Sequence, residues 1–177
     1  MNSHTAAVVW LTGLSGAGKS TIARAAAREL IQQGVRVEVL DGDAIRETLS
    51  RDLGYSKPDR DENVRRTGYV AGLLARHGVV VLVALISPYR AARDKVRQEM
   101  QSAGIRFMEV FVNAPLDICE SRDPKGLYEK ARRGEIPAFT GLEDPYEPPV
   151  APEVECLTSQ ESVETSVRTV LNSLAQK

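Results

Sequence analysis

The stretch Gly13-Leu14-Ser15-Gly16-Ala17-Gly18-Lys19-Ser20 decides the fold, because it fits the pattern G-x-x-x-x-G-K-[ST] at every required position. The apolar run Ala7-Val8-Val9-Trp10-Leu11 precedes it, and a helical pattern begins at Lys19. This order of strand, glycine loop and helix distinguishes a phosphate-binding loop from a chance glycine-rich turn. The glycines let the backbone curl, so that successive N–H groups and the positive end of the helix face one anion.

The loop also predicts individual roles for its residues. We expect Lys19 to reach the β- and γ-phosphates of a nucleotide, where it contributes to catalysis, and the Ser20 hydroxyl to bind Mg²⁺. The residues predicted to bind ATP are those of the loop and the first helical turn: Gly13, Leu14, Ser15, Gly16, Ala17, Gly18, Lys19, Ser20 and Thr21.

Composition narrows the class of protein. The 177 residues suit one domain, residues 1–177, and 23 Lys and Arg nearly balance 24 Asp and Glu. The chain therefore lacks the basic field of proteins that gather nucleic acid or anionic membrane. Cys119 and Cys156 lie far apart, which disfavours a metal site or a disulfide framework. Without a leader-like amino terminus or a run of 18 apolar residues, we expect a cytoplasmic protein that does not enter the membrane.

Hydrophobic periodicity predicts strands that alternate with helices. Helices are expected after the glycine loop and over about 44–49, 59–77, 89–102, around Cys119 and from Val163 onward. The strands are expected at 7–11, 35–40, 79–86, 107–112 and 154–157. This order predicts an α/β three-layer P-loop NTPase fold, with a mostly parallel five-stranded sheet covered by helices on both faces.

Three local features give more specific expectations. Asp59 with Glu62 resembles a capping box, which would open the helix that ends near His77. Residues 122–133 carry an excess of positive charge and no long apolar stripe, which predicts a mobile surface segment rather than core. The prolines and glycines of residues 134–152 predict irregular chain.

Polar residues end the strands on the same edge as the glycine loop. Asp41 and Asp43 follow the second strand, and Ser87 follows the long apolar strand. Ligands of open parallel α/β sheets bind beyond the carboxyl ends of the strands, so these side chains are expected to share a site with the loop.

The sequence favours a small-molecule kinase over other users of nucleoside triphosphates. It has no Asn-Lys-x-Asp base-reading motif of GTPases, and Asp123-Pro124-Lys125-Gly126 follows a helical stretch where a GTPase would have a strand. A motor ATPase usually ends a strand in Asp-Glu, whereas Gly42 follows Asp41 here. In a kinase, one carboxylate can face the acceptor hydroxyl while another helps to hold the metal.

Six further motifs occur in register along almost the whole chain. Together with the glycine loop they closely resemble the adenylyl-sulfate kinase family. The resemblance implies transfer of the γ-phosphoryl of ATP to the 3′-hydroxyl of adenylyl sulfate, with Mg²⁺, in a homodimer that serves sulfate assimilation. The motifs are Asp41-Gly42-Asp43-Ala44-Ile45-Arg46, Leu53-Gly54-Tyr55-Ser56, Asp59-Arg60-Asp61-Glu62-Asn63-Val64-Arg65-Arg66, Ile86-Ser87-Pro88-Tyr89-Arg90, Lys125-Gly126-Leu127-Tyr128 and Phe139-Thr140-Gly141.

The resemblance also implies the substrate-binding residues. Asp43 matches the family's carboxylate at the acceptor hydroxyl, and the rings of Tyr55 and Phe139 would sandwich the adenine of adenylyl sulfate. Lys125 lies in the segment, about residues 122–140, that forms a closing lid in this family. The remaining implied contacts to adenylyl sulfate are Arg46, Arg60, Asn63, Ile86 and Ser87.

Two positions depart from the family pattern, and two assignments have alternatives. Ala44 replaces the usual Asn and loses one polar contact, whereas Tyr55 replaces the usual Phe and keeps the stacking face. Arg65 and Arg66 suit either a substrate contact or a solvated helix face.

Ser87 also has two interpretations. Some descriptions of the family give this serine a phosphorylated intermediate, but no His follows to activate it. We favour direct in-line transfer, with Asp43 as the base and Ser87 as a catalytic-site residue that binds substrate. The alternative for Ser87 is a structural cap of the turn at Pro88.

Two other functions stay open from the residues alone. One is a kinase for another small hydroxyl acceptor, such as a sugar acid or a nucleoside monophosphate. The other is a nucleotide-binding regulatory subunit that has lost turnover, against which Lys19, Ser20 and Asp43 argue because all three are intact.

Overall fold

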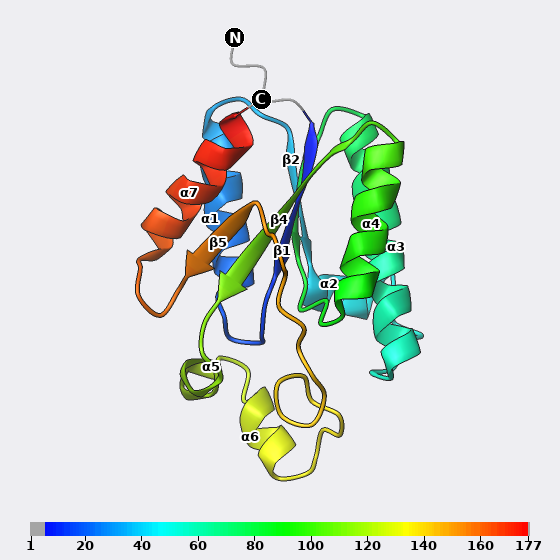
Figure 1. Cartoon of the computed structure of the whole chain (residues 1–177), viewed down its shortest axis with the longest axis vertical. Helices are drawn as coiled ribbons and strands as arrows, with labels where there is room; N and C mark the ends of the chain where they lie inside the picture. Colours follow the sequence, from blue (N-terminus) through cyan, green and yellow to red (C-terminus); the bar gives the residue numbers. More distant parts are fainter. Residues whose placement is uncertain (1–5, 177) are drawn as a thin grey trace.

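Five parallel strands form the sheet at the centre of the molecule (Figure 1). The computed structural model describes residues 6–176. The strands lie in the order β2-β3-β1-β4-β5, and every neighbouring pair is parallel. Their bounds are β1 Ala7–Thr12, β2 Val37–Asp41, β3 Val80–Ala84, β4 Arg106–Asn113 and β5 Val154–Leu157.

Helices cover both faces of this sheet, so the predicted three-layer fold is confirmed. Alternation along β1 explains the two cores: Ala7, Val9 and Leu11 pack with α1 and α7, whereas Val8 and Trp10 face α3 and α4. The helices are α1 Lys19–Gln32, α2 Gly42–Glu47, α3 Lys57–Arg76, α4 Arg90–Ser102, α5 Leu116–Arg122, α6 Leu127–Arg132 and α7 Val163–Ala175.

The start of α3 differs from the predicted one. The helix begins at Lys57, and the Ser56 hydroxyl accepts from the backbone N–H of Asp59 at 3.3 Å while it donates to the Asp59 carboxylate at 2.6 Å. The cap is therefore Ser56, and the prediction that Asp59 opens the helix with Glu62 was wrong. Pro58 lies in the first helical turn, where a proline fits because the N–H groups of that turn have no partner within the helix.

Residues 122–133 also differ from the prediction of a surface segment outside the core. They contain α6, whose Tyr128 is 2% exposed and whose Ala131 is buried. The Asp123 carboxylate begins this helix by accepting from the backbone N–H groups of Leu127, Tyr128 and Glu129 at 2.8, 3.2 and 3.1 Å. One buried ring and one side-chain cap thus fix a helix that is too short to show an apolar stripe.

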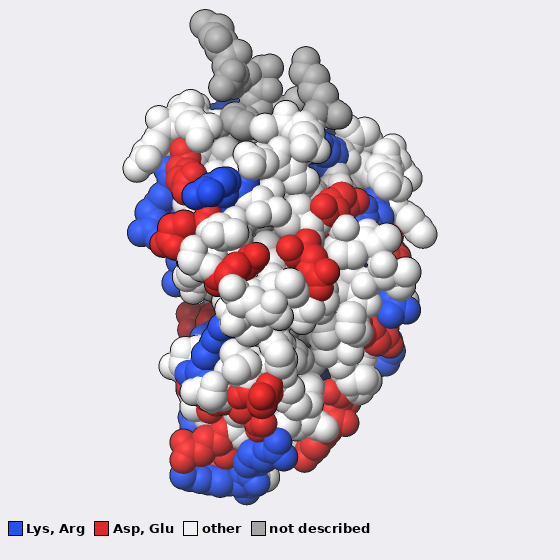
Figure 2. All heavy atoms as spheres, turned by 60° about the vertical axis from the view of Figure 1, so that its left-hand side comes forward, with Lys and Arg blue, Asp and Glu red and all other residues white. Residues whose placement is uncertain are grey.

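The short helices lie beyond the carboxyl edge of the sheet. In Figure 1, α5 and α6 sit below the strand ends, next to the irregular chain that precedes β5. None of the helices formed by residues 6–176 combines the length and apolar character needed to cross a bilayer. Figure 2 shows a face on which basic and acidic side chains are interspersed, down to the α6 end.

Candidate active site

A cavity of about 720 Å³ opens at the carboxyl edge of the sheet. This volume lies within the range of small-molecule sites. Gly13 and Leu14 belong to the glycine loop but do not contribute to the lining. The other predicted residues all line it: Ser15, Gly16, Ala17, Gly18, Lys19, Ser20, Thr21, Asp43, Arg46, Tyr55, Arg60, Asn63, Ile86, Ser87, Lys125 and Phe139.

The loop requires glycine at two positions where its backbone packs closely against neighbouring backbone carbonyl groups. A Cβ at Gly13 would lie 2.3 Å from the Val112 carbonyl oxygen, and a Cβ at Gly16 would lie 2.9 Å from the Cys119 carbonyl oxygen. Gly16 also has a φ of +76°, and Gly18, at +108°, precedes α1 without a side-chain cap. The loop therefore turns between β4 and α5 in a conformation that side chains would block.

Side chains from the second half of the protein hold the carbonyl groups of the loop. The Tyr128 hydroxyl donates to Ser15 O at 2.9 Å, and the Thr158 hydroxyl donates to Ala17 O at 2.7 Å. In a trans peptide the N–H points away from the preceding carbonyl. The N–H groups of Gly16 and Gly18 are therefore turned away from these partners, as an anion-binding loop requires.

Lys19 lies under the loop with its ammonium on backbone oxygens. Its Nζ donates to Gly13 O at 2.9 Å and to Leu14 O at 2.7 Å. Burial lowers the pKa of Lys19 to about 8, because desolvation disfavours the charged form. Both acceptors are neutral, so a phosphate group that enters the cavity would give this ammonium an anionic partner.

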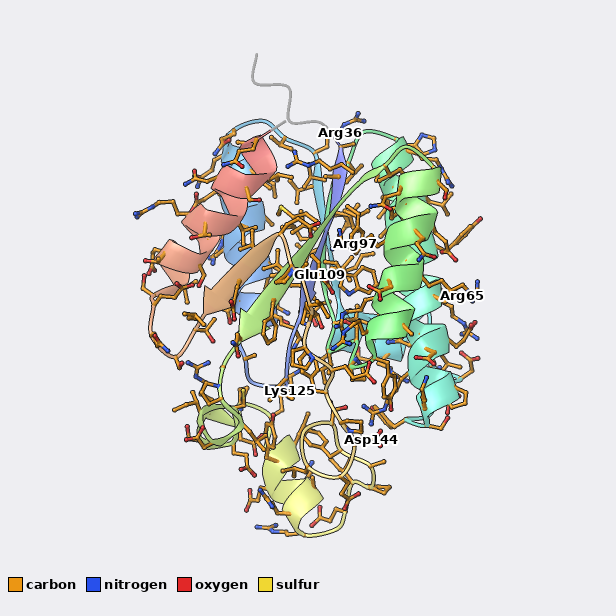
Figure 3. All side chains as sticks on the ribbon, in the orientation of Figure 1. Arg36, Arg65, Arg97, Glu109, Lys125 and Asp144 are labelled. Carbon is orange, nitrogen blue, oxygen red and sulfur yellow. The ribbon has the colours of Figure 1, made fainter. Side chains whose placement is uncertain are left out.

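The two aspartates after β2 have different environments. Asp41 is buried and caps α2 by accepting from Asp43 N at 3.2 Å, and it also accepts from Arg24 at 2.9 Å. Asp43 lies two residues further on, in the first turn of α2, and is exposed, and its Oδ2 accepts from the Lys125 ammonium. Figure 3 shows Lys125 below the strand ends, in the chain that leads to α6. The structure thus brings the predicted base and the predicted lid lysine together.

Arg46 and Tyr55 form one wall of the cavity. The Arg46 guanidinium lies 4.8 Å from the centroid of the Tyr55 ring and donates to Gly54 O at 2.6 Å. The Tyr55 side chain is exposed, with 60% of its surface accessible. Its ring is therefore held by a cation on one side and remains free to stack on a planar ligand.

Arg60 holds the part of the cavity lining that carries Phe139. It is buried, and its Nε donates to Tyr55 O at 2.7 Å while its guanidinium donates to Ala138 O and the Thr140 hydroxyl. Ala138 has a φ of +54°, so the chain turns sharply before Phe139. Sequence reasoning assigned Arg60 to substrate alone and missed that it positions Phe139.

The hydroxyl of Ser87 is engaged by the protein. It accepts from Trp10 Nε1 at 3.0 Å and donates to Leu85 O at 3.4 Å, and Ser87 is 3% exposed with a φ of +41°. The Ser87 carbonyl accepts from buried Arg93 at 2.7 Å. These contacts favour a structural role for this hydroxyl.

The other polar residues considered from the sequence separate into two groups. Asn63 is buried against the cavity, and its Oδ1 has no hydrogen-bond partner among residues 6–176. This oxygen can therefore accept a hydrogen bond from a ligand. Arg65 pairs with Glu62, and Arg66 pairs with Glu62 and Asp52, and neither arginine lines the cavity. For those two, the structure favours the solvated helix face.

Sequence reasoning missed one end of the cavity. Arg122 donates to Thr158 O at 2.6 Å and to Gly16 O at 3.3 Å, next to the phosphate loop. Glu161, Val163 and Ser166 also line this end. Glu161, Val163 and Ser166 follow β5, so the rule that ligands bind beyond the carboxyl ends of parallel strands could have found them. Arg122 lies in α5, outside that rule.

The family agrees with this geometry. Residues 5–157 match the adenylylsulphate kinase family. The adenylyl-sulfate kinase of Microcystis aeruginosa is 60% identical over 168 residues, which cover 95% of this chain and 91% of that protein. The corresponding protein of Gloeothece citriformis is 58% identical, with 95% and 93% covered.

A solved structure is similar to the whole described fold. The Mycobacterium tuberculosis APS kinase CysC, in complex with AMPPNP and APS, superposes with a TM-score of 0.94 at 46% identity, covering 97% of this chain and 99% of that one. The family match spans residues 5–157, and the two relatives are 60% and 58% identical over almost the whole chain. The chain therefore belongs to the adenylyl-sulfate kinase family.

Proposed function

We propose that this chain carries out the adenylyl-sulfate kinase reaction in the cavity at the carboxyl edge of the sheet. The γ-phosphoryl of ATP moves to the 3′-hydroxyl of adenylyl sulfate and gives 3′-phosphoadenylyl sulfate and ADP. The observation that carries the proposal is that Lys19, Asp43 and Phe139, a phosphate binder, a carboxylate and an aromatic wall, line one cavity.

The loop binds the phosphates of ATP in this proposal. The N–H groups of Gly16 and Gly18 face them, and Lys19 contacts the β- and γ-phosphates once it leaves Gly13 O and Leu14 O. The ammonium moves from neutral carbonyl acceptors to an anion, so its interaction strengthens as negative charge accumulates on the transferred group.

The acceptor nucleotide occupies the side of the cavity near α2 and α3. The adenine stacks between Tyr55 and Phe139, and the anionic groups meet Arg46 and Arg60. The unpartnered Oδ1 of Asn63 accepts a hydrogen bond from the nucleotide. Ile86 and Ser87, which follow β3, complete the lining on this side of the cavity. Support comes from the convergence of these groups on one cavity and from the burial of Arg60, Asn63 and Phe139.

Asp43 is the general base for the acceptor hydroxyl. One carboxylate oxygen, Oδ2, already bonds Lys125, which leaves Oδ1 for the proton of the 3′-hydroxyl. The hydroxyl oxygen then attacks the γ-phosphorus in line with the departing ADP oxygen. Lys19 and Lys125 offset the negative charge of the phosphoryl group during this transfer.

A magnesium ion fits the donor set of the cavity. Residues 6–176 contain no cluster of three or more His, Cys, Asp or Glu that would form an all-protein cage. Mg²⁺ bound to a nucleotide needs few protein ligands, because phosphates and waters complete its shell. The Ser20 hydroxyl would hold the ion, with the Asp41 carboxylate close by in the same lining, and the ion would neutralise phosphate charge.

Residues 122–140 act as a lid within a single domain of residues 1–177. Lys125 reaches the cavity from this segment, and Phe139 is part of its wall, so ligands would contact it directly. Hydrogen exchange of this segment should slow when adenylyl sulfate and ADP are added together. Equal exchange with and without ligands would contradict a closing lid.

Membership of the family further supports a homodimer that acts in the cytoplasm in sulfate assimilation. Light scattering on the purified chain tests the assembly: a mass of twice 19.4 kDa is expected. A monomer or a larger assembly would contradict it.

A coupled ADP-release assay with a panel of acceptors tests the reaction itself. ADP release with adenylyl sulfate, and not with gluconate or AMP, is the expected result. Release with gluconate or AMP alone would identify a kinase for another acceptor. Tight ATP binding without release for any acceptor would identify a regulatory protein.

A further inference from the structure

Tyr128 touches both sides of the active site without lining the cavity. It lies on α6, is 2% exposed, and is absent from the cavity wall to which its neighbour Leu127 contributes. Its hydroxyl donates to Ser15 O in the phosphate loop, and its ring packs against Phe139. Its hydroxyl also meets the Cys119 thiol. Because Tyr128 does not line the cavity, it can act on the reaction only through the groups that it touches.

The contact with Ser15 fixes one peptide plane of the phosphate loop. Burial raises the pKa of Tyr128, so the phenol keeps its proton and remains a donor over the physiological range. The hydrogen bond of 2.9 Å holds the Ser15 carbonyl, and the trans peptide then directs the Gly16 N–H to the opposite side. Gly16 has a φ of +76° and no side chain to limit its rotation, so this external contact restricts the peptide plane.

The contact with Phe139 fixes the aromatic wall. The two rings meet edge to face, with centroids 4.9 Å apart and an interplanar angle of 76°. Arg60 holds the same short stretch from the other side through Ala138 O and Thr140. Phe139 is therefore placed between Tyr128 and the α3 arginine, and a shift of Tyr128 removes one of the contacts that fix its ring.

We propose that Tyr128 is a positioning residue that couples the two nucleotide subsites, because one side chain sets both the Gly16 N–H and the Phe139 ring. The inference rests on the proposed function. Phosphate bound at the loop aligns the Ser15–Gly16 peptide, strengthens the Tyr128 contact and orders Phe139 for the acceptor adenine. Binding of ATP thus tightens binding of adenylyl sulfate, and the reverse holds by the same factor. Leu14 of the loop also lies beside Gly141, where an added Cβ would come within 3.0 Å of it, and this second connection leaves a residual coupling.

Removal of one hydroxyl tests this coupling. Tyr128→Phe keeps the ring on Phe139 and removes the bond to Ser15. Tyr146→Phe is the matched control, because the Tyr146 hydroxyl bonds Thr12 Oγ1 at 3.0 Å and its ring lies outside the cavity lining. Calorimetry gives the Kd of adenylyl sulfate with and without AMPPNP, and the ratio of the two Kd values is the coupling factor.

We expect AMPPNP to tighten adenylyl sulfate binding about 10-fold in the unaltered chain, within the usual range of coupling between sites. Tyr128→Phe should reduce the factor to about 2, with Tyr146→Phe unchanged. A factor near one in the unaltered chain, an unchanged factor in Tyr128→Phe, or an equal loss in Tyr146→Phe would overturn the inference. If the unaltered chain does not bind adenylyl sulfate at all, the proposed function fails and this inference with it. If the unaltered chain binds adenylyl sulfate but Tyr128→Phe leaves the coupling factor unchanged, the proposed function stands and only this inference fails.

Discussion

Asp43 and Lys125 form an ion pair at the cavity, although 82 positions separate them in the sequence. The pair joins the first turn of α2 to the chain between α5 and α6, where Figure 3 labels Lys125. Both side chains are largely exposed, so the pair adds little to stability, as is usual for surface ion pairs. The ion pair instead orients the two side chains, since it places the Lys125 ammonium beside the carboxylate that we propose as the base.

Asp43→Asn should lower kcat by about 10²-fold or more, because the amide cannot take the proton of the acceptor hydroxyl. The Kd of ADP should stay within about 2-fold, because the phosphates lie on the loop. Steady-state kinetics and calorimetry check both values. Asp117→Asn, at an exposed position in the first turn of α5, is the control and should leave kcat unchanged. An unaltered kcat in Asp43→Asn would remove this residue from catalysis.

Lys125→Met should lower kcat/KM for adenylyl sulfate by about 10- to 100-fold, because charge next to the transferred phosphoryl is lost. Stability should change by less than about 0.5 kcal/mol, since an exposed ion pair contributes little. Lys130→Met on the exposed part of α6 gives the comparison for a lysine that does not line the cavity. The role of Lys125 is refuted if the two variants have the same kcat/KM.

Ser87→Ala should retain kcat within about 10-fold, because transfer in our proposal passes directly from ATP to the acceptor. The variant should lose about 1 to 3 kcal/mol of unfolding free energy, since Trp10 Nε1 would be left buried without its acceptor. Urea denaturation and ADP release measure the two effects. Complete loss of turnover, together with a phosphorylated serine found in the unaltered protein by mass spectrometry, would favour a covalent intermediate instead.

Gly16→Ala should destabilise the protein more than Gly34→Ala, although the two glycines have nearly equal φ values of +76° and +78°. A Cβ at Gly34 meets no atom within 4 Å, so that variant measures backbone strain alone, about 1 kcal/mol. A Cβ at Gly16 would also press on the Cys119 carbonyl oxygen at 2.9 Å. Thermal unfolding and ADP titration of both variants test this, and equal Tm and Kd values would show that the close approach has no effect.

Lys19→Met should abolish most ATP binding yet stabilise the free protein. The folded-state pKa of about 8 lies below the ordinary 10.5, so folding disfavours the charged form. The resulting cost, on the order of 3 kcal/mol at about 1.4 kcal/mol per pKa unit, is fully present below pH 8 and vanishes as the pH rises through 10.5. The gain in unfolding free energy should therefore be large at pH 7 and small near pH 10. Denaturant unfolding of both proteins at the two pH values is the measurement, and a gain independent of pH would contradict it.

Features with a local physical cause could be predicted from the sequence. The glycine loop and β5, found at Val154–Leu157 as expected, depend on residue types within a few positions of one another. The parallel sheet follows from strands that alternate with helices along the chain. The start of α3 was misplaced by two residues because Pro58 occurs both in loops and in the first turn of helices.

The missed features depend on partners that are distant in sequence. The Tyr128 hydroxyl meets Ser15 across 113 positions, and Trp10 meets Ser87 across 77. Neither pairing leaves a periodic trace, because each involves a single side chain and a single acceptor. The motifs could therefore name Arg60, Ser87 and Phe139 as site residues, but not the protein groups that hold them.

The position of β1 between β3 and β4 has a consequence for synthesis on the ribosome. The nucleotide loop is translated well before its supporting neighbours, among them the Val112 carbonyl against Gly13, which lies 99 positions further along the chain. A nascent chain that stops short of β4 cannot shape this loop, so the capacity to hold a nucleotide arises only after β4 has left the exit tunnel.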